Sequence, residues 1–148
     1  MMISLARTER EIAACFETMR ELRTHLVEGE FVAQVKAMMA EDYQLAFIEE
    51  TGRVVCVAGF RVSTNFFLGK HLYVEDLSTA EDSRSAGHGA RMMAWLREKA
   101  RAEGCAAIDL DSGVQRHRAH RFYFDQGMHI ACHHFLEYLP PLRDEDQG

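Results

Sequence analysis

Apolar and polar positions recur with two different periods along the chain, and each period predicts a type of element. In the N-terminal part, apolar residues recur every three or four positions, which predicts helices. Thr8 and Glu11 have capping-box spacing for the first helix, which we expect to break at Gly29 before a second helix over 31–40. A short strand over 3–5 is expected before both helices.

The remaining chain alternates between extended and helical patterns. The elements expected there are, in order, strands over 43–50, 53–64 and 71–79, a helix over 87–101, a strand over 105–110, a helix over 116–126 and a strand over 129–139. The first two of these strands form an antiparallel hairpin, and 71–110 forms a right-handed crossover between parallel strands. This order predicts an α+β (mixed α/β) fold with helices on both faces of the sheet.

Length and composition restrict the possible classes of protein. The 148 residues suit one domain, which we expect over 1–141, followed by a short charged tail over 142–148. A net charge of −6 disfavours nucleic acid as a partner. The longest apolar runs, such as 54–60, are too short for a membrane span, and no secretory signal is seen over 1–5, so we expect a cytoplasmic protein. The four cysteines form no CxxC pair and are expected to be reduced core thiols.

A glycine-containing segment stands between a predicted strand and the helix predicted over 87–101. It reads Arg84-Ser85-Ala86-Gly87-His88-Gly89-Ala90. Its glycines allow successive N–H groups to converge, and the helix adds the positive end of its dipole there, which favours a phosphate-bearing ligand. A simple turn remains the alternative. The residues of a P-loop and of a dinucleotide fold are both missing.

This segment resembles the signature of the GNAT superfamily of N-acetyltransferases: Arg or Gln, two residues, Gly, one residue, then Gly or Ala. Arg84, Gly87 and Gly89 match it. The resemblance implies a mixed, mostly antiparallel central sheet of about six to seven strands and acetyl-CoA as co-substrate, with no metal. It assigns the coenzyme A site to Arg84, Ser85, Ala86, Gly87, His88, Gly89 and Ala90 and, for the pantetheine arm, to Leu77, Ser78 and Thr79.

The segment 121–128 resembles the aromatic-Tyr and Gly-hydrophobic pattern of the last helix in that family. The resemblance makes Tyr123 the acid that protonates the departing thiolate, and a phenol has a suitable pKa for this. A core tyrosine is the alternative. Where the family often has an Asn to contact the pantetheine arm, this chain has Arg116, which could meet a phosphate of coenzyme A instead.

Two carboxylates lie in the strand before the loop. Because side chains alternate along a strand, we expect Glu75 and Asp76 to point to opposite faces. The passage Val74 to Leu77 is similar to the Leu-Glu-Asp segment of polyamine and diamine acetyltransferases, which implies that Glu75 is the base and that both carboxylates bind the amine. Glu75 as a mere electrostatic anchor, or as a solvent-facing residue, is the alternative.

Histidines are frequent near the C-terminus, but we expect no metal site. His117 and His120 are flanked by arginines, and His133 and His134 alternate across a predicted strand.

The sequence therefore predicts an N-acetyltransferase that acetylates a primary amine, expected to be a small cationic one, by direct attack in a ternary complex. A protein N-terminal or lysine acetyltransferase and a non-catalytic acyl-CoA-binding module are the alternatives. A homodimer is left open.

Overall fold

The computed structural model describes residues 2–84 and 86–140. Their elements are β1 (Ile3–Leu5), α1 (Glu9–Ala14), α2 (Phe16–Leu22), α3 (Glu28–Met39), β2 (Gln44–Glu50), β3 (Arg53–Asn65), β4 (Gly69–Thr79), the 3₁₀ helix η1 (Glu81–Ser83), α4 (His88–Ala102), β5 (Ala107–Leu110) and α5 (His117–Asp125). The chain divides into two compact units, Met1–Leu110 and Asp111–Gly148. The expected tail over 142–148 lies outside the described residues, and the single domain over 1–141 stays a prediction.

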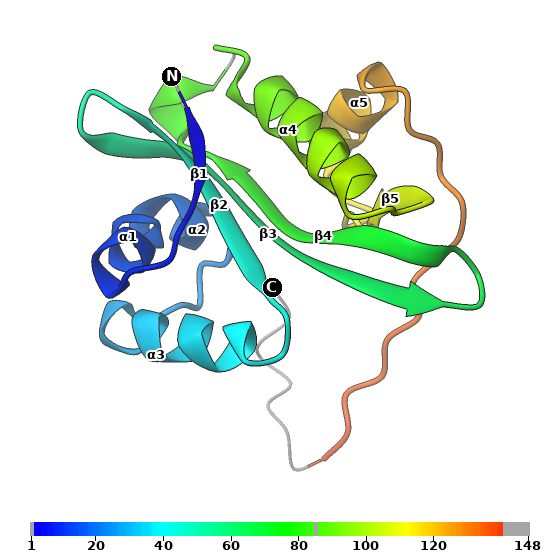
Figure 1. Ribbon diagram of the computed structural model, residues 1–148, viewed down its shortest axis with the longest axis horizontal. Coiled ribbons are helices and arrows are strands. Elements are labelled where there is room, and N and C mark those ends of the chain that lie inside the picture. The colour runs from blue at the N-terminus through cyan, green and yellow to red at the C-terminus, as the bar shows by residue number, and fades with distance from the viewer. Residues whose placement is uncertain (1, 85, 141–148) are drawn as a thin grey trace. The chain divides into compact units, whose positions relative to one another are not determined.

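The first unit is one five-stranded sheet in the order β1-β2-β3-β4-β5. Neighbouring strands are antiparallel except for β4 and β5, which are parallel and joined by α4, as predicted. Helices α1, α2 and α3 cover one face, and α4 covers the other (Figure 1). The predicted α+β fold with helices on both faces is therefore confirmed.

Local signals explain where the first elements begin and end. Thr8 caps α1, and its capping box with Glu11 is complete. The turn between β2 and β3 has positive φ at Thr51 (51°) and Gly52 (78°), which matches the twist of an antiparallel hairpin. The predicted break at Gly29 is wrong, because the chain leaves the helix at Arg23 and Gly29 lies inside α3.

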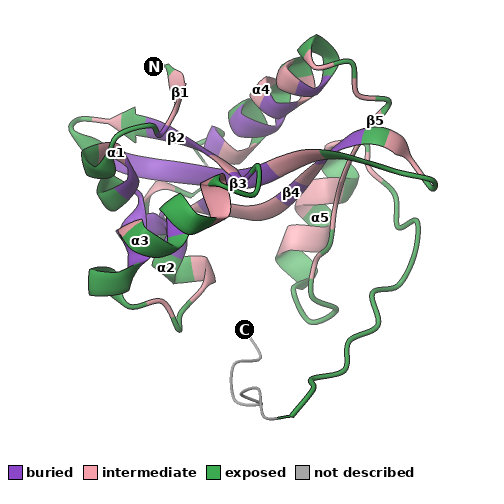
Figure 2. Ribbon diagram, turned by 60° about the horizontal axis from the view of Figure 1, so that its bottom comes forward, coloured by how far each residue is buried: buried purple, intermediate pink, exposed green. Residues whose placement is uncertain are grey.

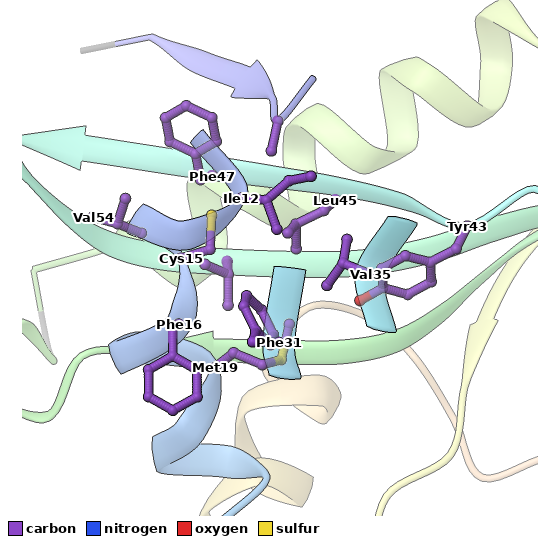
Figure 3. Packing of buried hydrophobic residues seen from close by; sticks show 12 residues of the cluster. Ile12, Cys15, Phe16, Met19, Phe31, Val35, Tyr43, Leu45, Phe47 and Val54 are labelled. Carbon is purple, nitrogen blue, oxygen red and sulfur yellow. The ribbon is translucent and has the colours of Figure 1, made fainter. Parts of the chain in front are cut away.

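Between the sheet and the N-terminal helices lies a core of packed aromatic and aliphatic side chains (Figure 3). Phe16 and Phe31 meet edge to face with ring centroids 5.4 Å apart. Burial is concentrated along β2 and β3, which carry long runs of buried residues (Figure 2). This rigid centre of the sheet holds β4, the strand that carries both carboxylates.

The strand predicted over 129–139 is wrong. In the described part of the second unit, residues 129–139 form no strand, and Ile130 and Phe135 are exposed. A strand needs a neighbouring strand to form its backbone hydrogen bonds. Residues 111–140 contain no strand that could serve as this neighbour. The sheet therefore has five strands among the described residues, rather than six or seven.

Candidate active site

The distal half of β4 has an open edge. In the described sheet, β5 pairs only with residues 71–74, so residues 75–79 have a strand neighbour on the β3 side alone. Ala80 donates its N–H to the Val55 carbonyl at 2.8 Å. Since hydrogen-bonded and non-bonded pairs alternate in an antiparallel ladder, Leu77 and Thr79 turn their backbone groups toward the open edge.

Ser78, the third residue expected at this edge, is placed differently. By the same alternation its backbone groups point to β3, and its hydroxyl donates to the Thr18 carbonyl at 2.8 Å. Ser78 therefore ties β4 to α2. Leu77 and Thr79 carry the polar backbone groups that a ligand lying along this edge could reach.

Three N–H groups converge at the start of α4. Gly87, the N-cap, has φ 85°, a left-handed conformation that favours glycine. The N–H groups of His88, Gly89 and Ala90 precede the first helical bond, which Arg91 donates to the Gly87 carbonyl at 3.1 Å. In the described residues no side chain caps this end. Amides and helix dipole together fit a phosphate group. Ser85 lies outside the described residues.

The side chain of His88 is buried at this helix start, a placement that was not predicted from the sequence. His88 is buried, and its Nδ1 accepts from Arg91 at 2.6 Å, because an arginine can only donate. Its Nε2 lies 3.5 Å from Glu50 Oε1 without a hydrogen bond. The sequence signal for this placement was the histidine directly before the second glycine of the loop.

Arg84 folds back onto the end of β4. Its Nε donates to the Thr79 carbonyl at 3.2 Å, and its guanidinium lies 3.7 Å from Glu21 Oε1. These contacts orient the loop, and the side chain remains about half exposed.

A β-bulge decides where the two carboxylates of β4 point. Gly59 pairs with Asp76 and Phe60 pairs with Val74, so Glu75 is the extra residue. Phe60 packs edge to face on Trp95 of α4, with ring centroids 6.1 Å apart, so Gly59 and its partner Asp76 face α1–α3. The prediction of opposite faces is wrong, because the extra residue shifts the alternation and places Glu75 on this face too.

Both carboxylates take part in one cluster with two arginines and a tyrosine. Asp76 accepts from Arg23 Nε at 2.9 Å and from the Tyr43 hydroxyl at 2.8 Å. Arg23 also donates to the Glu75 backbone carbonyl at 2.9 Å. The Glu75 carboxylate lies 3.0 Å from Arg61 Nε, and the Arg61 guanidinium lies 5.7 Å from the centre of the Tyr43 ring. These three partners, Arg23, Arg61 and Tyr43, were not predicted from the sequence.

Burial raises the pKa of the Glu75 carboxyl, and the charge of Asp76 acts in the same direction, while Arg61 and Arg23 oppose the shift. Its side chain is 23 % exposed, so a proton on it can still exchange with solvent or with a bound molecule. A carboxylate with a raised pKa is a stronger base than an ordinary one.

In the second unit, Tyr123 lies two turns after Arg116 on the same side of α5. Burial raises the pKa of the Tyr123 phenol, and the charge of Arg116 acts in the opposite direction. Its ring meets that of Phe122 edge to face, with centroids 5.3 Å apart. Gly127, with φ 89°, ends the helix, and Met128 donates to the Tyr123 carbonyl at 3.1 Å.

The cysteines are free, but only some lie in the core. Burial raises the pKa of Cys15 to about 12 and that of Cys56 to about 11, so neither is a ready nucleophile. Cys105 is half-buried and Cys132 is exposed, so the expectation of four core thiols is wrong. Within residues 2–84 and 86–140 no three His, Cys, Asp or Glu side chains are grouped as a metal site. No helix in that part is long and apolar enough to span a membrane.

Comparison with known proteins supplies the family. The model of the Acetyltransferase (GNAT) family matches residues 7–128. The chain belongs to the GNAT family. This GNAT protein is therefore an acyltransferase, an N-acetyltransferase, and the resemblance seen in the sequence is confirmed.

Two curated proteins are similar to this GNAT acetyltransferase. The uncharacterized N-acetyltransferase YhdJ of Bacillus subtilis (strain 168) is 32 % identical over 120 residues, which cover 80 % of this chain and 84 % of that protein. The aminoalkylphosphonate N-acetyltransferase of Salmonella typhimurium (strain LT2) is 32 % identical over 66 residues, or 45 % of this chain and 43 % of that protein.

Solved structures share the GNAT fold. The aminoglycoside N-acetyltransferase AAC(6')-Iy, in complex with CoA, has a TM-score of 0.81 at 9 % identity, over 94 % of this chain and 95 % of that one. The glucosamine-6-phosphate N-acetyltransferase of Arabidopsis thaliana has a TM-score of 0.73 at 19 % identity, over 93 % and 99 % of the two chains. At these identities the likeness concerns the fold.

Proposed function

We propose that this GNAT protein transfers the acetyl group of acetyl-CoA to a primary amine, with Glu75 as the base and Tyr123 as the acid. The observation that carries the proposal is the start of α4, where no side chain among residues 2–84 and 86–140 caps the helix. There a left-handed Gly87 precedes the three N–H groups of His88, Gly89 and Ala90, which have no helical acceptor. Such amides, at the positive end of a helix dipole, suit the diphosphate of the coenzyme.

The remaining expected coenzyme contacts fall into three sets. Ser85 and Ala86, together with Gly87, continue the diphosphate loop in the sequence. Leu77 and Thr79 direct backbone groups to the open edge of β4, where an extended pantetheine arm could bond to them as a neighbouring strand would. Arg84 orients the loop and Ser78 ties β4 to α2, so both support the coenzyme site indirectly. A direct contact of either residue with the coenzyme stays a prediction.

Glu75 is suited to accept the proton that the amine must lose before it can attack. An ammonium has no lone pair, so transfer requires a base, and a carboxylate with a raised pKa can supply about 10²- to 10⁴-fold in rate. The Tyr123 phenol can give its proton to the departing thiolate. Direct attack without a covalent enzyme intermediate stays a prediction, and it is supported for Cys15 and Cys56, whose thiols burial holds in the unreactive form.

The acceptor is the remaining part of the proposal. The named substrates of two similar proteins, an aminoalkylphosphonate and glucosamine-6-phosphate, are both amines. A small cationic amine for this chain, with Glu75 beside its nitrogen, stays a prediction. Asp76 was also expected to bind the amine, but its bonds to Arg23 and Tyr43 favour a supporting role.

Calorimetry with coenzyme A on two matched glycine variants tests the proposal. Gly87 and Gly104 both have left-handed φ, 85° and 78°, at opposite ends of α4, and an added Cβ would meet no atom within 4 Å at either. Valine is strongly disfavoured in that conformation, so both substitutions strain the backbone. We expect Gly87→Val to weaken coenzyme A binding about ten-fold or more, while Gly104→Val keeps the wild-type affinity.

Equal affinities in the two variants would contradict the assignment of the diphosphate to the start of α4. A thiol-release assay with acetyl-CoA and a panel of amines completes the test, because a GNAT enzyme must release the thiol when an acceptor is present. No heat with coenzyme A and no thiol release would refute the proposed function as a whole.

A further inference from the structure

The cluster around the bulge of β4 has no net charge to attract a purely cationic acceptor. Its carboxylates, Glu75 and Asp76, are balanced by Arg23 and Arg61. Asp76 is 12 % exposed and accepts on both oxygens, from Arg23 and from Tyr43. A polyamine would therefore find a neutral surface with one of its two carboxylates already occupied.

Arg61 differs from Arg23 in how it is held. Arg23 donates two hydrogen bonds, to the Asp76 side chain and to the Glu75 backbone, and so serves the scaffold. Arg61 Nε lies 3.0 Å from the Glu75 carboxylate, yet it is buried and forms no hydrogen bond. The guanidinium is placed over the Tyr43 ring, and the side chain is 29 % exposed. It is oriented by packing but is not locked in a hydrogen-bonded ion pair.

We infer that Arg61 binds an acidic group on the acceptor, so that the substrate is a primary amine that also carries a carboxylate, phosphonate or phosphate. This inference rests on the proposed function, in which Glu75 receives the amine. A carboxylate and a guanidinium side by side match a molecule whose ammonium and acid are a few bonds apart. Guanidinium is also the side chain best suited to planar acids and phosphates, because it offers several fixed donors.

The test compares acceptors that differ only in the acid. Thiol release is measured with β-alanine and its amide, with 2-aminoethylphosphonate and ethanolamine, and with putrescine as a diamine. We expect the wild-type protein to acetylate the acid-bearing member of at least one pair about ten-fold or more better in kcat/KM. The difference should lie mainly in KM, since the acid binds in the ground state and the transition state alike.

In Arg61→Gln, the ratio of kcat/KM for the acid-bearing amine to kcat/KM for its partner without the acid should fall to about one. The readout is the ratio of the kcat/KM values of the two acceptors in a pair. Absolute rates would not serve, because losing Arg61 also alters the charge beside Glu75 and hence the rate with every amine. Arg61→Lys should keep part of the preference. Arg20→Gln is the matched control, since Arg20 also pairs with a glutamate (Glu17, 3.1 Å) and lies 5.7 Å from the centre of an aromatic ring, that of Phe16. Circular dichroism checks that each variant is folded.

The outcomes separate this inference from the function on which it rests. Acetylation of putrescine, or of the amide of β-alanine and ethanolamine, as fast as that of the acid-bearing amines would refute a role for Arg61 in recognition while leaving the enzyme an N-acetyltransferase. An acid preference that survives Arg61→Gln would refute it as well, and so would coenzyme A binding without turnover of any acid-bearing amine. Absence of both coenzyme A binding and thiol release is the result that removes the proposed function itself.

Discussion

Gly59 is the position where one added methyl group should disturb the carboxylate cluster most. A Cβ built there would lie 1.8 Å from the Tyr43 hydroxyl oxygen, 2.4 Å from the ring carbon that carries it and 2.6 Å from Asp76 Oδ2. Tyr43 is 4 % exposed and packed in the core, so its ring cannot swing aside. Gly59 itself lies outside the left-handed region, so the effect comes from lack of space.

The expected loss of stability has two parts. Overpacking a close-packed site costs about 1–3 kcal/mol. Displacing the Tyr43 hydroxyl also breaks its bond to the Asp76 carboxylate, and a hydrogen bond to a charged group contributes about 1.5–3 kcal/mol. We therefore expect Gly59→Ala to lower the free energy of unfolding by about 2.5–6 kcal/mol, with acetyl transfer reduced as well because the bulge holds Glu75.

Urea unfolding followed by circular dichroism measures this effect, with Gly29→Ala as the control. Gly29 lies in α3 with no atom within 4 Å of an added Cβ, so alanine there should stabilise the protein by about 0.4–1 kcal/mol. The two substitutions are chemically identical and have opposite expected signs. If Gly59→Ala stayed within about 0.5 kcal/mol of wild type, the usual range of harmless surface changes, the close packing of Tyr43 against β3 would be wrong.

Two further predictions concern the reacting groups. Tyr123→Phe should lower kcat about ten-fold or more in the thiol-release assay and leave coenzyme A affinity nearly unchanged, whereas the exposed Tyr138→Phe should change neither; equal rates for Tyr123→Phe and wild type would remove the phenol from the mechanism. Burial raises the pKa of Glu75, so the wild-type rate should fall as the pH drops through that raised pKa, where the base becomes protonated. In the pH range between the pKa of Glu75 and that of the amine, Glu75→Gln should lose activity relative to wild type. The loss should be largest at the lower pH values, where few acceptor molecules are neutral in solution. Glu49→Gln, at the exposed position near the end of β2, is its control. A pH profile of Glu75→Gln parallel to wild type would show that Glu75 is not the base.

Much of the first unit could be predicted because its signals are local. The capping box at Thr8, the turn at Gly52 and the helix stop at Gly104 each depend on residues within a few positions. The parallel crossover through α4 follows from the order of strand, helix and strand, because the connection is right-handed in nearly all proteins. The family could be recognised from the loop before α4, because the backbone conformation at Gly87 requires glycine and so leaves a local signature in the sequence.

The position of Glu75 could not be read from alternation alone. A β-bulge depends on how two strands pair, and pairing is a property of residues far apart in the sequence. A signal was nevertheless present, since Gly59 interrupts an otherwise apolar strand, and a glycine in a strand often marks a bulge or a close approach. Here it marks both, because Tyr43 and Asp76 occupy the space that a side chain would fill.

The segment 129–139 shows why a strand can be predicted from local sequence and yet be absent from the structure. Its apolar residues favour a strand, but a strand tendency says nothing about which backbone completes the ladder. Within the described part of the second unit there is no other strand, and the segment stays exposed. The partner of a strand is the information that a single sequence lacks.

The bulge also changes what the two neighbouring carboxylates are able to do. Had they faced opposite sides, one of them would have packed beneath α4, away from Arg23, Arg61 and Tyr43. With both on the α1–α3 face, Asp76 can bind Arg23 and Tyr43, which leaves the adjacent Glu75 beside the less constrained Arg61. One carboxylate thus stabilises the cluster while the other keeps the raised pKa that a base needs. The same glycine that relieves the clash with Tyr43 therefore makes this division of roles possible.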